Sequence, residues 1–115
     1  MTIKRIDTQP RWSEIVIHNN TLYYTSVPDN LDGDAYEQTM SALAQIEAAL
    51  ISQGSDKTKI LDATILLPNL ADAAEMNRAW DSWVPAGHAP TRCAFQAQLM
   101  NPRYKVEIKI IAAVD

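Results

Sequence analysis

The stretch Lys59-Ile-Leu-Asp-Ala-Thr-Ile-Leu-Leu67 decides the fold class. Its β-branched and aliphatic residues favour a β-strand, and Pro68 ends it because proline cannot donate to a sheet ladder. Large aliphatic side chains stand at both odd and even positions, with Asp62 as the exception. A strand with so few polar positions is covered on both faces. We therefore expect residues 59–67 to be buried in a layered domain.

Two amphipathic helices flank this strand in the sequence. Residues 35–53 and residues 71–84 repeat apolar side chains at steps of three and four, which predicts a helix with one apolar face in each. The stripe residues are Tyr36, Met40, Leu43, Ile46 and Leu50 in the first helix, and Ala73, Met76, Trp80 and Trp83 in the second. Asp32 or Asp34 is placed to cap the first helix, and Gly54 to end it.

The remaining strands are predicted as two hairpins. Residues 14–27 surround the turn signal Asn19-Asn20, since asparagine tolerates positive φ. Residues 91–99 and 104–114 are joined by a turn at 100–103, which pairs Arg92 with Ile111 and Gln96 with Glu107. The order β-β-α-β-α-β-β indicates an α+β fold, a mixed sheet with both helices on one face.

The other face of this sheet needs a different cover, because two helices protect only one side. Alternation within residues 91–99 and 104–114 predicts that it carries polar side chains, namely Arg92, Gln96, Gln98, Lys105, Glu107 and Lys109. The same alternation sends Cys93 to the core. Since residues 59–67 are apolar on both faces, a partner subunit is favoured over water.

Composition bounds the class of protein. The 115 residues fit one domain, residues 1–115, and the formal net charge of −4 argues against a nucleic-acid or membrane partner. A basic cluster near the C-terminus, formed by Arg92, Arg103, Lys105 and Lys109, keeps a ribonuclease alternative open.

One cysteine excludes an intrachain disulfide and suits a reducing, cytoplasmic location. Neither a signal peptide nor an apolar run of about 20 residues is expected. With His18 and His88 far apart, we expect no metal site.

Two residues are candidates for chemistry. Arg92 follows Pro90-Thr91, and a guanidinium fixed there would bind a carboxylate through two parallel hydrogen bonds. The alternative is a surface arginine in water. Glu107 would position a water molecule or act as an acid or base, and its alternative is an exposed ion pair with neighbouring lysines. These patterns alone leave the function open.

The C-terminal third resembles a known family. Ala89-Pro-Thr-Arg-Cys93, followed after a strand and turn by Val106-Glu-Ile108 and a tail of small residues, is similar to the signature of the Rid family, also called YjgF or L-PSP. The strand at 59–67 and the Ala74-Glu-Met-Asn-Arg-Ala-Trp80 segment resemble its middle section. The likeness covers nearly the whole chain and is nearest to the YoaB-like branch.

This resemblance implies six strands and two helices per subunit, a homotrimer, and ligand sites in clefts between subunits. The implied activity is hydrolysis of reactive enamines and imines, such as 2-aminoacrylate, to a 2-oxo acid and ammonia, without a cofactor. Arg92 matches the arginine that binds the substrate carboxylate, and Glu107 the acidic residue that handles water. Thr25 matches a hydroxyl residue of the site.

The chain departs from the family pattern at two places. Ser26-Val27 stands where deaminases have Gly-Gln, and Trp12 stands where many members have a pocket tyrosine. We expect Arg92, Glu107 and Thr25 to be catalytic, and Trp12 and Ser26 to bind substrate with Arg92 and Thr25. Because the two departures alter the pocket, a non-catalytic module that binds a small carboxylate remains an alternative, and an endoribonuclease a lesser one.

Overall fold

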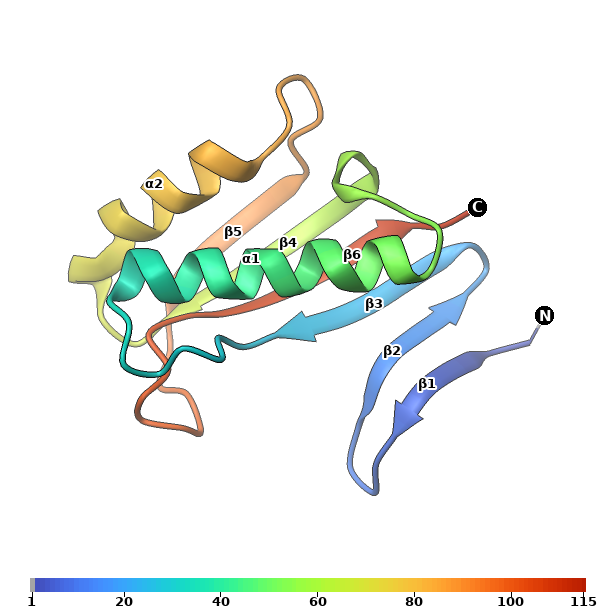
Figure 1. The fold of residues 1–115 in the computed structure, drawn as a ribbon, viewed down its shortest axis with the longest axis horizontal. Coiled ribbons are helices and arrows are strands. Elements are labelled where there is room, and N and C mark those ends of the chain that lie inside the picture. Colours follow the sequence, from blue (N-terminus) through green and yellow to red (C-terminus); the bar gives the residue numbers. More distant parts are fainter. Residues whose placement is uncertain (1) are drawn as a thin grey trace.

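The computed structural model describes residues 2–115 as one six-stranded sheet with both helices on the same side of it (Figure 1). The strands are β1 (Lys4–Thr8), β2 (Ser13–His18), β3 (Thr21–Ser26), β4 (Ile60–Leu67), β5 (Thr91–Gln96) and β6 (Glu107–Ala113), and the helices are α1 (Ala35–Ser52) and α2 (Ala73–Trp83). The strand order is β1-β2-β3-β6-β4-β5. The predicted α+β class and mixed sheet are confirmed.

The core lies between the sheet and the two helices. β4 sits between two strands, and its Ala63, Ile65 and Leu67 are buried against the helix layer. Both helix stripes face this core, where Leu43, Ile46, Leu50, Met76, Trp80 and Trp83 are buried. On the other face of β4, Leu66 is only half-buried, because no element of residues 2–115 covers that side. We call this uncovered side the open face.

The predicted C-terminal hairpin is wrong. β5 and β6 do not pair with each other, because β4 lies between them. β4 pairs with β5 in parallel and with β6 in antiparallel orientation. β4, α2 and β5 thus form a β-α-β unit, whose helical crossover brings its two strands into parallel register. Arg92 is aligned with Ala63 rather than with Ile111.

The changed pairing also corrects the predicted faces. Directly paired residues point to the same side of a sheet. Arg92 is paired with Ala63, which is fully buried beneath the helices, so Arg92 belongs to the helix side. Cys93 is paired with Thr64 and is exposed on the open face, not in the core. Glu107 and Lys109 do lie on the open face, as expected.

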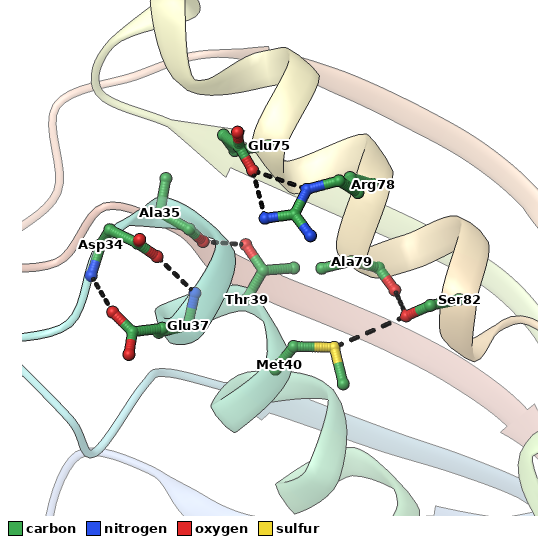
Figure 2. Close-up of polar contacts among 9 residues, drawn as sticks. All are labelled: Asp34, Ala35, Glu37, Thr39, Met40, Glu75, Arg78, Ala79 and Ser82. Atoms are coloured by element: carbon green, nitrogen blue, oxygen red, sulfur yellow. Dashed lines mark hydrogen bonds and ion pairs between the residues drawn. The ribbon is translucent and has the colours of Figure 1, made fainter.

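The helix ends follow local capping rules. Asp34 accepts from the Glu37 backbone, and the Glu37 side chain accepts from the Asp34 backbone, which completes a capping box (Figure 2). Gly54 follows the helix with φ +78°, a conformation that glycine adopts without strain. α2 is confirmed over 73–83, and residues 70–72 before it form a 3₁₀ turn. Neither helix of residues 2–115 is both long and apolar enough to span a membrane.

The two helices also contact each other through polar side chains. Ser82 donates to the Ala79 carbonyl and points toward Met40 Sδ, 3.7 Å away (Figure 2). Trp83 Nε1 donates to Glu47 at 3.1 Å, which explains why a carboxylate stands beside the apolar stripe of α1. These contacts fix α2 against α1, and therefore fix the α2 residues that lie beside β5.

The N-terminal strand was not expected from its residues. β1 is mostly exposed and pairs only with β2, so it has no clear alternation of buried and exposed side chains. A second feature of this region shapes the site. The pairing of β2 with β3 ends at Ile15 and Tyr24. Beyond that point Ser13 pairs only with β1, and Thr25 and Ser26 pair only with β6. β2 and β3 diverge there (Figure 1).

Candidate functional site

Arg92 is held on the helix side of β5 by three residues of α2. Its Nη1 donates to Asn77 Oδ1 at 2.8 Å and contacts Met76 Sδ at 3.6 Å. Its guanidinium carbon lies 5.4 Å from the centre of the Trp80 ring, within the range of a cation–π contact. These contacts come from one turn of helix, and they restrict the guanidinium although the residue as a whole is exposed.

The orientation of Arg92 leaves donors free for a ligand. Within residues 2–115, both hydrogen bonds of this guanidinium leave from Nη1. The Nε–Nη2 edge therefore keeps two parallel N–H groups for an incoming group, and this is the edge that matches a carboxylate in bidentate fashion. Arg92 has no carboxylate partner among the ion pairs of the described residues. It is a positioned cation without its anion.

A cavity of about 410 Å³ occupies the place where β2 and β3 diverge. We call it the splay cavity. Its lining residues are Trp12, Ser13, Glu14, Tyr24, Thr25, Val27 and Gln45. Of the residues predicted for the site, the cavity thus brings together Trp12 and Thr25. The Trp12 side chain is 58% exposed, so an aromatic face remains available for contact with a ligand.

Two further cavity residues were missed by the sequence reasoning. Glu14 and Tyr24 lie next to the strand break, on β2 and β3. Burial, and then the negative charge of Glu14, raise the pKa of Tyr24, which stays a neutral phenol. The available signal was the position of Glu14, a carboxylate directly before the apolar run Ile15-Val16-Ile17. Without the register, nothing distinguished Glu14 from a surface residue.

Glu107 begins β6 on the open face. Glu107 is paired with Leu66 of the neighbouring strand β4. On the other side of β6, Thr25 of β3 is paired with Lys109, which is two residues after Glu107. Thr25 and Glu107 are therefore diagonal neighbours on adjacent strands, at about 7–8 Å. Within residues 2–115 the Glu107 carboxylate forms no ion pair. It is half-buried and free to contact a ligand or a second chain.

One chain does not bring Arg92 to Glu107. Arg92 is aligned with Ala63, and Ala63 with Ile110, three residues from Glu107. Three residues along a strand and two strand spacings across amount to roughly 14 Å, and the two side chains lie on opposite faces. Thr25 is three strands away from β5. The candidate residues form two separate half-sites.

Ser26 lies outside both half-sites. It is 1% exposed, and its hydroxyl donates to the Ala42 carbonyl of α1 at 2.8 Å. In this position it attaches β3 to the helix layer. The binding role expected for Ser26 from the family position stays a prediction, and this hydrogen bond gives the residue a structural role. Among residues 2–115, no group of three histidine, cysteine, aspartate or glutamate side chains is arranged to hold a metal ion.

Comparison with known proteins assigns the family. A family model described as Endoribonuclease L-PSP matches residues 2–114. The RutC family protein YoaB of Escherichia coli (strain K12) is 68% identical over 114 residues, covering 99% of this chain and all of that protein. A crystal structure of a YjgF family member from Neisseria meningitidis is 45% identical, with a TM-score of 0.95 and coverage of 100% and 97%.

The fold and these matches define a Rid-type α+β domain. The chain belongs to the L-PSP family, also called Rid or YjgF, as its C-terminal signature indicated. A more distant relative is the 2-iminobutanoate/2-iminopropanoate deaminase of Rattus norvegicus, 25% identical over 108 residues, covering 88% of this chain and 78% of that protein. Thus the YoaB protein carries only a family name, and a chemical activity is named for this distant relative.

Proposed function

We propose that this protein is an enamine and imine deaminase, which hydrolyses reactive 2-imino acids to 2-oxo acids and ammonia. The observation that carries the proposal is the held guanidinium of Arg92, whose free Nε–Nη2 edge fits the carboxylate that every 2-imino acid possesses. The activity named for the rat relative supports this choice of substrate class.

The proposed site is shared between subunits of a homotrimer. The open face supplies the surface for association, because apolar side chains stand on it without a cover. They are Val16, Tyr23, Leu66, Phe95 and Ile111, of which Tyr23 and Phe95 are 41% and 49% exposed. In the proposed trimer, the edge strand β5 of one chain adjoins the splay cavity of a neighbour. Arg92 of one subunit then faces Thr25, Glu107 and Trp12 of the next.

The mechanism requires little from the protein beyond positioning. Arg92 anchors the substrate carboxylate, and the enamine tautomerises to the imine. Water attacks the imine carbon, with Glu107 and Thr25 orienting that water through their oxygen atoms. Because imines hydrolyse readily in water, orientation and modest acid–base help are sufficient. Trp12 supplies an apolar wall without a hydroxyl, and the residues named here require no cofactor.

The charge distribution disfavours the ribonuclease alternative suggested by the family model's description. Arg103 forms an ion pair with Asp32, and the Lys105 ammonium donates to the Gly33 carbonyl at 2.8 Å. Two of the four cations in the C-terminal basic cluster are thus engaged within the chain. Lys109 lies on the open face and Arg92 on the helix side, so the cluster forms no continuous basic groove for a phosphate backbone.

The test is turnover of imines generated in place. An amino-acid oxidase would supply 2-imino acids from several amino acids, and the release of 2-oxo acid would be followed with and without the protein. We expect acceleration that depends on Arg92. Binding of small carboxylates without any acceleration would favour the non-catalytic module, and degradation of RNA under low salt would favour the ribonuclease.

A further inference from the structure

The splay cavity has the chemistry of a site for a cation. Glu14 contributes a carboxylate, Trp12 an aromatic face, and Thr25 and Tyr24 hydroxyl groups. Within residues 2–115, Glu14 forms no ion pair and no side-chain cation lines the cavity. Glu14 and Tyr24 both belong to the lining of this cavity. An aromatic face and an unpaired carboxylate together favour a positively charged ligand group.

We propose that Glu14 binds the positively charged nitrogen of the substrate's iminium form and transfers the proton that releases ammonia. This inference rests on the proposed function and assigns its substrate in more detail: a zwitterion with a carboxylate at Arg92 and an iminium at Glu14. The two half-sites then have opposite charges, and each matches one end of the ligand. A 2-imino acid in its protonated form has this pair of charges: its carboxyl carbon is bonded directly to its iminium carbon.

The proton and electron balance is complete with water as the only co-substrate. Water oxygen forms a bond to the iminium carbon, and the electron pair of the C=N π bond moves to nitrogen. The proton lost by the water passes to Glu14 and then to nitrogen. The C–N bond breaks as ammonia leaves with the bonding pair, the remaining hydroxyl becomes the carbonyl, and ammonia takes up its proton. The products are a 2-oxo acid and ammonium.

Neighbouring groups support Glu14 rather than another acid for this role. Asp7 is outside the lining of the splay cavity, and it lines an adjoining hollow with Glu14 and neutral residues of α1. Glu107 is on the open face, outside the lining of the splay cavity. Glu14 is therefore the carboxylate of the cavity wall, while Glu107 can approach the water from the open face.

The first experiment compares two ligands that differ mainly in charge. L-Alanine carries an ammonium where lactate carries a hydroxyl, and both have the same carboxylate. Calorimetric titration should show that the wild-type trimer prefers alanine by about tenfold, which corresponds to about 1.4 kcal/mol. Glu14→Gln should remove the preference, and Glu14→Asp should keep part of it. Glu75→Gln is the matched control, because Glu75 is an exposed glutamate on α2 that pairs with Arg78.

The second experiment measures imine turnover by the same variants. Glu14→Gln should lower kcat by about 100-fold, the lower end of what acid–base catalysis contributes, and Glu75→Gln should not. Equal affinity of the wild type for alanine and lactate would overturn the inference. So would a folded Glu14→Gln or Glu14→Asp protein that retains full preference and full kcat. If the wild-type protein binds alanine more tightly through Glu14 and yet does not accelerate imine hydrolysis, this result would refute the deaminase function but support the cation site.

Discussion

The two half-sites differ in what the single chain provides. At β5, the chain fixes the direction of the Arg92 guanidinium through Asn77 and leaves this residue exposed. At the splay of β2 and β3, the chain forms a cavity with an acid, but without a cation. Each half-site lacks what the other has. This difference supports the proposal that the binding site is completed by association of subunits.

The largest effect is expected from charging the open face. If the proposed trimer forms through this face, Phe95→Asp should convert it to monomers and abolish imine turnover, because an unpaired buried charge costs several kcal/mol. Light scattering would measure the mass of each variant. Ile51→Asp is the control, since Ile51 is similarly exposed, at 61%, but lies on α1. Full imine turnover by a wild-type protein that sediments as a monomer would contradict the proposal that each site is shared between subunits.

Loss of the cation should have the next largest effect. Arg92→Ala should weaken carboxylate binding by at least about 100-fold, since each charge-assisted hydrogen bond contributes about 1.5–3 kcal/mol. Arg92→Lys should recover little, because an ammonium lacks the planar fork. Titration with lactate measures the affinity, and circular dichroism checks the fold. Unchanged imine hydrolysis by Arg92→Ala would remove this residue from the site.

Mixed trimers test whether one site takes Arg92 and Glu107 from different chains. Arg92→Ala and Glu107→Gln proteins should each be nearly inactive, but refolding them together should restore some intact sites if each site takes one residue from each chain. Turnover per trimer in mixtures of known ratio is the measurement. The control is refolding each variant alone. Verified mixed trimers that recover no activity would refute the shared site.

A smaller effect is expected from the residue that positions Arg92. Asn77→Ala should weaken carboxylate binding by about tenfold, because one hydrogen bond of about 1–1.5 kcal/mol no longer restricts the guanidinium. Asn77→Asp would pair with Arg92 and compete with the ligand, so binding should weaken more. Ligand affinity measured at equal trimer concentration distinguishes this role from a purely structural one, for which affinity would not change.

The smallest effect on the site is expected at Ser26. Ser26→Ala should lower the free energy of unfolding by about 1 kcal/mol, because a buried hydroxyl-to-carbonyl hydrogen bond is lost. Its hydroxyl is enclosed between β3 and α1, so affinity for lactate should remain unchanged. Chemical denaturation and titration together measure both quantities. A clear loss of affinity with unchanged stability would return Ser26 to the binding site.

Local patterns were sufficient for both helices and for every strand except β1, but not for the order of the strands in the sheet. The stripes of α1 and α2, the Asp34 cap and the Gly54 stop depend on residues a few positions apart. The pairing of β5 with β4 depends instead on residues that are far apart in the sequence. A hairpin was expected because sequential strands often pair, yet the strand–helix–strand order of residues 60–96 already contained the signal for parallel pairing of β4 with β5.

The sequence by itself determined the α+β class, the family signature around Arg92 and Glu107, and the excess of apolar residues in β4. These depend on composition and short-range spacing. Only the tertiary structure decided that β4 separates β5 from β6, that Arg92 and Glu107 lie on opposite faces, and that Glu14 lines a cavity. The reason is physical: side-chain direction alternates at every residue of a strand, so the face of a side chain depends on register, and register is set by contacts distant in sequence.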